Sequence, residues 1–206
     1  MSGRFITLEG GEGVGKSTQA KALAGALRAR GIEVVETREP GGSEGAEAIR
    51  TLILEGKADR WSQRAEALLF AAARADHVEK TIRPAINAGK WVVCDRFLDS
   101  SIAYQGDAVG ADAVRTLHSI GSEDYLPDRT LVLALPNEEA AVRAAIRDRD
   151  GADRIGGRDK DYHIGVANNF ALQAKMNPER IRMVNAAGAP EDVTMRLVAA
   201  LDDLLP

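Results

Sequence analysis

Short apolar segments alternate with amphipathic segments along almost the whole chain. Five of the apolar segments have the length and composition of strands. They span residues 4–9, 33–38, 90–95, 130–135 and 181–185. The segment at 90–95 is nearly all apolar, as expected for a strand that is buried on both faces of a parallel sheet.

Between these strands, apolar residues recur every three or four positions, which is the spacing of helices. The predicted helices span residues 16–30, 43–54, 64–87 with a break near Pro84, 100–104, 111–122, 138–147, 162–175 and 190–205. Strands that alternate with helices pair in parallel through right-handed crossovers. The pattern therefore predicts an α/β fold in which helices flank a five-stranded parallel sheet, within a single domain over residues 1–206.

Composition and charge narrow the classes of function. The net charge of −4 over 206 residues argues against a nucleic-acid partner, because nucleic-acid surfaces are basic. The single cysteine, Cys94, permits no intrachain disulfide, as is usual in a reducing cytosol. The chain shows neither a signal peptide nor an apolar stretch of about 18 residues that could span a membrane. We therefore expect a cytoplasmic protein with no membrane partner.

One motif carries specific chemistry. Residues 10–17 read GGEGVGKS and match the pattern G-x-x-x-x-G-K-[ST]. Glycines allow several backbone N–H groups to turn toward a phosphate, Lys16 adds a positive charge, and Ser17 offers a hydroxyl to Mg²⁺. The predicted strand before the motif and helix after it are the context that a phosphate-binding loop, or P-loop, requires. We therefore expect a three-layer P-loop NTPase fold.

Asp95 and Arg96, at the end of the third predicted strand, lie at the sheet edge where such folds bind ligands. Asp95 could hold Mg²⁺ through water and Arg96 could bind a second phosphate group, or the two could serve a surface salt bridge. Glu12 places a carboxylate inside an anion-binding loop, which is unfavourable beside a triphosphate. It either meets a substrate hydroxyl or Mg²⁺, or it turns to solvent.

Two further patterns leave alternatives open. Phe70 and Arg74 share a helix face, so they could stack on a base and bond its carbonyl edge, although their spacing alone favours a core Phe70 and a solvated Arg74. The polar segment 148–161 suits either a mobile lid over phosphates or a solvated loop with local ion pairs. The arginines in or just before it are Arg143, Arg147, Arg149, Arg154 and Arg158.

With these segments in view, the chain resembles the bacterial thymidylate kinase family over nearly its whole length. The matching segments are LEGGEGVGKST at 8–18, TREPGG at 37–42, LFAAAR at 69–74, DRF at 95–97 and SIAYQG at 101–106. The resemblance implies an ATP-dependent nucleoside monophosphate kinase that transfers the γ-phosphoryl group of Mg·ATP to dTMP, giving dTDP. It also implies a homodimer, which members of the family usually form.

The resemblance assigns roles to individual residues. ATP-binding positions are Gly10, Gly11, Glu12, Gly13, Val14, Gly15, Lys16, Ser17 and Thr18. For dTMP, the resemblance places Glu12 at the sugar 3′-hydroxyl, Arg96 and Arg38 at the phosphate, and Phe70 and Arg74 on thymine. The other positions that it assigns to dTMP are Pro40, Ser101, Tyr104 and Gln105. The metal positions are Ser17 and Asp95, and the catalytic set is Lys16, Arg96, Glu12 and Arg154.

Arg154 enters this set because residues 153–155, DRI, match the family's lid motif. Bacterial members of this type carry the catalytic arginine in the lid rather than in the P-loop, and Gly13 has no basic side chain to replace it. The resemblance therefore implies a lid arginine, with Arg147 and Arg149 as the alternatives to Arg154. The alternative functions are that of a kinase for another deoxynucleotide or deoxynucleoside and that of a catalytically inactive P-loop binding module. A GTP-dependent switch is disfavoured because the sequence contains no N-K-x-D motif.

Overall fold

The computed structural model describes residues 3–57, 59–147 and 153–206. The strands are β1 (Phe5–Glu9), β2 (Val34–Arg38), β3 (Trp91–Asp95), β4 (Arg129–Ala134) and β5 (Ile181–Asn185). They pair in parallel in the order β2-β3-β1-β4-β5. The predicted five-stranded parallel sheet is therefore confirmed, with each strand end within one residue of its predicted position.

The helices follow the predicted order. They are α1 (Lys16–Arg28), α2 (Glu44–Leu54), α3 (Gln63–His77), α4 (Arg83–Asn87), α5 (Leu98–Val109), α6 (Ala111–Ser122), α7 (Asn137–Arg147), α8 (Lys160–Met176) and α9 (Pro190–Ala199). None of the helices in the described part of the chain is both long enough and apolar enough to cross a membrane.

Three predicted helices differ from the structure by more than two residues. The helix expected over 64–87 is interrupted by a π-helical turn at Val78–Ile82, after which Pro84 lies in the first turn of α4, where its missing N–H costs nothing. Helix α5 runs from Leu98 to Val109 rather than over 100–104, because its first two turns are buried against the sheet. Helix α9 ends at Ala199, since the chain then turns to bury Leu201.

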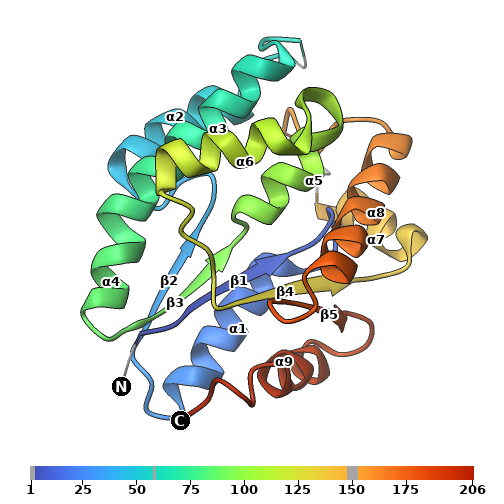
Figure 1. Ribbon diagram of the computed structural model, residues 1–206. Helices are drawn as coiled ribbons and strands as arrows, with labels where there is room; N and C mark the ends of the chain where they lie inside the picture. Colours follow the sequence, from blue (N-terminus) through green and yellow to red (C-terminus); the bar gives the residue numbers. More distant parts are fainter. Residues whose placement is uncertain (1–2, 58, 148–152) are drawn as a thin grey trace.

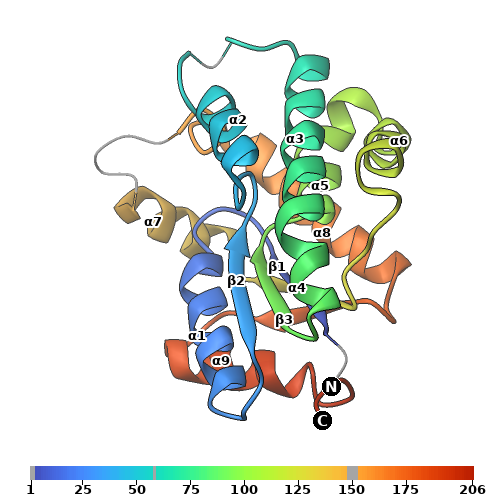
Figure 2. The ribbon, with the colours of Figure 1, turned by 90° about the vertical axis from the view of Figure 1, so that its left-hand side faces the viewer.

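Helices cover both faces of the sheet (Figures 1 and 2). Because side chains alternate between the faces of a strand, Ile6 and Leu8 pack into the core beneath α1 and α9. Phe5 packs on the opposite face, with its ring centroid 4.9 Å from that of Phe97. Burial on both faces makes the central strand β1 a rigid support for the loop that follows it.

Candidate active site

The loop between β1 and α1 borders one end of a cavity of about 540 Å³, a size typical of a small-ligand site. Gly10, Gly13 and Gly15 have φ angles of 134°, 75° and 92°, which residues with side chains rarely adopt. The loop and the start of α1 line the cavity over residues 12–18. The glycines of the motif are therefore required by the path of the backbone.

Gly10 and Gly11 serve this loop through their carbonyl oxygens and are not among the lining residues. The oxygen of Gly11 accepts a hydrogen bond of 2.6 Å from Lys16 Nζ, and that of Gly10 accepts one of 3.2 Å from Arg96 Nη1. Both bonds hold a cationic side chain beside the loop.

Gly13 allows α7 to approach the loop closely. A Cβ atom at this position would lie 2.0 Å from Ala140 O and 2.9 Å from Ala144 N, both in α7. No side chain fits there, basic or otherwise. The close approach brings another cation to the cavity wall, because Arg143 of α7 lines the cavity while pairing with Glu139 at 2.5 Å.

Lys16 is the first residue of α1 and is buried within the site. Burial, together with the positive charge of Arg96, lowers its pKa to about 8, against the opposing effect of Glu12 and Asp95. A bound polyphosphate would supply the negative charge that favours the protonated form. Binding of a nucleotide phosphate would therefore favour the positively charged form of Lys16.

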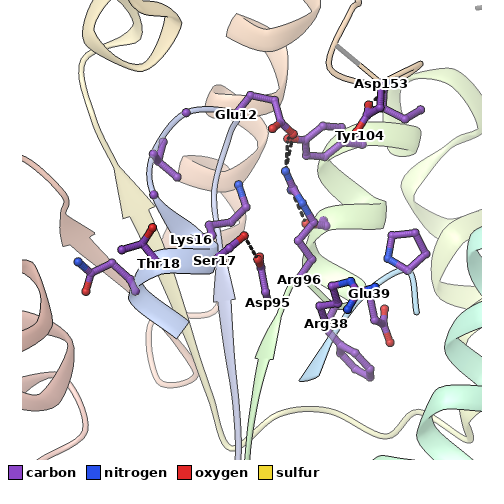
Figure 3. Close-up of a pocket in the computed structure, with 18 of the residues that line it drawn as sticks. Glu12, Lys16, Ser17, Thr18, Arg38, Glu39, Asp95, Arg96, Tyr104 and Asp153 are labelled. Atoms are coloured by element: carbon purple, nitrogen blue, oxygen red, sulfur yellow. Dashed lines mark hydrogen bonds and ion pairs between the residues drawn. The ribbon is translucent and has the colours of Figure 1, made fainter. Parts of the chain in front are cut away.

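Ser17 and Asp95 face one another beside Lys16 (Figure 3). Ser17 Oγ donates a hydrogen bond of 2.5 Å to Asp95 Oδ2. The other carboxylate oxygen, Asp95 Oδ1, is buried and has no hydrogen-bond partner among the described residues. A hydroxyl and a carboxylate with a spare buried oxygen are the hard oxygen ligands that Mg²⁺ prefers, so these two residues fit the predicted metal position.

Arg96 is the second cation of the site and lies between the P-loop and α5. Its Nη2 donates to Glu12 Oε1 at 2.5 Å and to Tyr104 Oη at 3.1 Å, and the guanidinium lies 4.8 Å from the Tyr104 ring centroid. Figure 3 shows the three side chains converging. The partner that Glu12 required is thus Arg96, rather than solvent, and the surface salt bridge considered for Arg96 is excluded.

The backbone of Arg96 is held in an unusual conformation by a buried glutamate. Its φ is 73°, a left-handed value that is uncommon outside glycine. Glu9 accepts a hydrogen bond of 2.7 Å from Phe97 N and contacts Ser100 Oγ, and Ser100 in turn accepts one from Arg96 Nη1. Burial and the charge of Asp99 raise the pKa of Glu9 to about 8, against the opposing effect of Ser100 and Arg96.

The far end of the cavity is lined by Phe70 and Arg74 of α3 and by Ser101, Tyr104 and Gln105 of α5. The side chain of Arg74 is only 3% exposed, so the expectation of a solvated arginine is wrong. Its Nε donates to Glu39 Oε2 at 2.8 Å, and its Nη2 donates to Ser101 Oγ at 2.8 Å and to Phe97 O at 3.1 Å. Nη1 takes part in none of these bonds.

The segment after β2 forms the side of the cavity. Arg38 and Pro40 both line it. Arg38 is half exposed and pairs with Glu47 at 2.9 Å, while the oxygen of Pro40 accepts a bond of 2.7 Å from Arg50. The structure therefore gathers around one cavity every residue that was assigned to dTMP from the resemblance.

The predicted lid is described only in part. Residues 148–152, including Arg149, and the side chain of Arg147 lie outside the described residues. Asp153 and Ile155 line the cavity, whereas Arg154 is turned to α2 and α3. Its Nε donates to Ile53 O at 2.8 Å and its Nη2 to Glu66 Oε2 at 2.6 Å. Among the described arginines that the sequence placed in or before the lid, Arg143 is the one on the cavity wall.

Three buried glutamates, of which Glu39 lines the cavity and Glu9 and Glu66 lie behind it, were not identified as site residues from the sequence. Glu9 ends β1, Glu39 lies within the REPGG segment, and Glu66 precedes Phe70 by four residues, so it shares the helix face of that ring. All three are buried. The spacing of Glu66 was the available signal, but exposed glutamates on helices are so common that spacing alone does not mark one as functional.

A phosphate-binding loop at the centre of a parallel sheet, facing a second arginine-bearing end of the same cavity, defines a nucleotide kinase of the P-loop class. The thymidylate kinase family model matches residues 8–197. The chain is 68% identical to the thymidylate kinase of Rhizorhabdus wittichii, with 100% of both chains covered, and 45% identical to that of a Bradyrhizobium species (BTAi1), covering 98% of this chain and 91% of the relative. The chain belongs to the thymidylate kinase family.

A solved structure supports the same conclusion. The crystal structure of thymidylate kinase from Ehrlichia chaffeensis superposes with a TM-score of 0.78 at 28% identity, covering 98% of this chain and 100% of that one. The predicted P-loop NTPase fold and the predicted class of enzyme, a nucleoside monophosphate kinase, are confirmed.

Proposed function

We propose that the protein transfers the γ-phosphoryl group of Mg·ATP to dTMP, giving dTDP. The observation that supports this proposal best is a single cavity with two cationic side chains at its phosphate-binding part, Lys16 from the P-loop and Arg96 from the β3–α5 connection. One cation serves each nucleotide. Their common position over the sheet edge suits transfer of a phosphoryl group between two phosphates that lie end to end.

The donor end binds ATP through the backbone N–H groups of residues 10–18, with the Lys16 ammonium at the β- and γ-phosphates. Ser17 and Asp95 are the residues that hold Mg²⁺, which supplies positive charge to the phosphates when bound. No covalent intermediate is needed, since an acceptor phosphate is already ionised at neutral pH. Catalysis consists of alignment and charge neutralisation.

The acceptor end binds the phosphate of dTMP on Arg96, supported by Arg38. Because Glu12 occupies Arg96 Nη2, a phosphate that binds there takes over this position, and the carboxylate becomes available to the sugar 3′-hydroxyl. Tyr104, which contacts both groups, lies beside the sugar. After the exchange the Glu12 carboxylate accepts hydrogen bonds from the sugar 3′-hydroxyl and from Tyr104 Oη, and these replace the ion pair that it gives up.

The base is read by one donor and one acceptor. Arg74 Nη1 is free of the bonds that fix the rest of its guanidinium, and Gln105 Oε1 is buried with no hydrogen-bond partner in the described part of the chain. Thymine offers the complementary edge, the O4 acceptor beside the N3–H donor. Cytosine offers the reverse pattern, and guanine repeats the thymine pattern on a larger ring that must share the space beside Phe70.

Arg154 acts from the lid, residues 148–161, by neutralising charge on the transferred group. Since its guanidinium is bound to Glu66 and Ile53, this role requires a shift of the segment, and Arg143 is the candidate already on the cavity wall. The protein works as a single P-loop kinase domain, forms a homodimer and acts in the cytoplasm. Membership of the thymidylate kinase family supports these proposals.

The proposal is tested by turnover of dTMP, dUMP, dCMP, dGMP and thymidine with Mg·ATP, followed as ADP release. We expect dTMP to have the highest kcat/KM, with dCMP lower by at least about a hundredfold, because its edge leaves both Arg74 and Gln105 unpaired. Thymidine lacks the phosphate that Arg96 binds and should not be turned over. Preference for thymidine would indicate a nucleoside kinase, and no turnover of any acceptor would indicate a binding module.

A further inference from the structure

We propose that Glu66 determines which base the cavity accepts, by fixing the side-chain amide of Gln105 with its oxygen free for the ligand. The inference rests on the proposed function and concerns a residue that contacts neither nucleotide directly, so Glu66 is a positioning residue. The previous subsection assigned recognition of the base to Arg74 and Gln105, and the inference adds that Glu66 sets the orientation of the Gln105 amide. Its basis is the set of donors that surround this one buried carboxylate.

Glu66 lies in the second turn of α3, and its side chain is 3% exposed. Oε2 accepts hydrogen bonds of 2.6 Å from Arg154 Nη2 and 2.7 Å from Arg158 Nη2. Oε1 accepts bonds of 3.0 Å from Arg158 Nη2 and 3.3 Å from Gln105 Nε2. The carboxylate therefore joins α3, α5 and the segment 153–158 at one point.

The orientation of the Gln105 amide follows from the chemistry of its neighbour. An amide can present either its NH₂ or its oxygen, but an ionised carboxylate beside two guanidinium groups only accepts. The NH₂ group must face Glu66, and the oxygen is left over. Gln105 is 3% exposed and lines the cavity, so its buried, unpartnered Oε1 is available to an N–H donor of a bound base.

The two arginines also determine what a substitution would do. In Glu66→Gln the new side chain has one oxygen and one NH₂ group. Oε2 faces two donors, Arg154 and Arg158, so the oxygen of the new amide takes that position. Its NH₂ group then takes the Oε1 position, where Arg158 gives up its longer bond of 3.0 Å and keeps the one of 2.7 Å to the amide oxygen. The amide of Gln105, which also faces this position, must turn to accept from the NH₂ group. The cavity would receive an N–H group in place of an oxygen, which suits cytosine N3 and opposes thymine N3–H.

The experiment compares dissociation constants for dTMP and 5-methyl-dCMP, measured by calorimetry on the full chain. The two nucleotides share one shape and differ in the hydrogen-bonding pattern at N3 and C4. We expect the wild-type protein to prefer dTMP, and Glu66→Gln to reduce the preference by at least about tenfold, the effect of reversing one hydrogen bond. In a Gln105→Met background, which has no amide to turn, Glu66→Gln should leave the preference unchanged.

Asp203→Asn is the matched control. Asp203 also pairs with a buried arginine, Arg129, at 2.6 Å, but Arg129 begins β4 at the opposite edge of the sheet from the cavity. The control should keep the wild-type preference. An unchanged preference in Glu66→Gln, or an equal loss in the Gln105→Met background, would overturn the inference. Since these are binding ratios, they are distinct from failure of the wild-type protein to phosphorylate dTMP, which would overturn the proposed function itself.

Discussion

The two ends of the cavity, which we propose bind the donor and acceptor phosphates, are built in different ways. At the donor end, a continuous segment, 10–18, supplies backbone N–H groups and a lysine, and its shape comes from glycines. At the acceptor end, three polar side chains from different parts of the chain are each supported by a buried glutamate. Arg96 is supported through Ser100 by Glu9, Arg74 by Glu39 and Gln105 by Glu66.

This difference indicates which substitutions should impair each end of the cavity. Substitutions other than to proline leave the backbone N–H groups in place, so the donor end depends on its single lysine and on the space its glycines leave open. The acceptor end depends on side chains, so its affinity and its selectivity can be changed separately. The following predictions test this contrast, beginning with the largest effect.

Lys16→Ala should cause the largest loss of activity. The ammonium is the one side-chain cation that the P-loop itself contributes, and charge neutralisation is the main source of catalysis in phosphoryl transfer. We expect kcat to fall by about a thousandfold or more, with the circular dichroism spectrum unchanged. Near-normal turnover in the substituted protein would remove the P-loop from the mechanism.

Arg96→Ala should act selectively on the acceptor. Loss of the charged hydrogen bonds to a phosphate should raise the KM for dTMP by roughly a hundredfold, while the KM for ATP changes much less. Steady-state kinetics with each substrate varied in turn measures both values. A change confined to ATP would show that Arg96 belongs to the donor end and that the two ends were assigned incorrectly.

Gly13→Ala tests the space that the donor end requires. The added methyl group would lie 2.0 Å from Ala140 O, so α7 must move, and we expect the free energy of unfolding to fall by about 1–3 kcal/mol. Gly11→Ala in the same loop is the control, because its Cβ would have no atom within 4 Å. Equal stability of the two variants, measured by denaturant unfolding, would contradict the close packing of α7.

The smallest effect is the pH dependence of ATP binding. Because burial lowers the pKa of Lys16 to about 8, the free protein loses this charge as the pH rises through 8, and ATP should then bind less well. We expect the KM for ATP to rise by a few-fold to about tenfold between pH 7 and 9. The KM for dTMP should change less, since Arg96 remains protonated and Glu9, whose pKa is also about 8, reaches the Arg96 side chain only through Ser100. Parallel changes in both values would point to Glu9 rather than Lys16 as the titrating group.

The same contrast explains what could be predicted from the sequence. The fold and the donor end could be predicted from the sequence, because strand periodicity is local and the P-loop is continuous in the chain. Arg96 could be proposed from its place at the end of the third strand. Phe70 and Arg74 could be assigned only through resemblance, since their spacing alone favours a core ring and a solvated arginine. Glu66 and its arginines could not be foreseen, because their contact joins residues about ninety positions apart and no periodicity encodes it.

The central claim is that Arg96 holds the acceptor phosphate after releasing Glu12, while Lys16 holds the donor. A crystal structure with Mg²⁺, dTMP and a non-hydrolysable ATP analogue tests it most directly. We expect the dTMP phosphate on the Arg96 guanidinium, Glu12 at the sugar 3′-hydroxyl, and the analogue's β- and γ-phosphates at Lys16. An intact Arg96–Glu12 ion pair, with dTMP bound elsewhere or absent, would contradict the account.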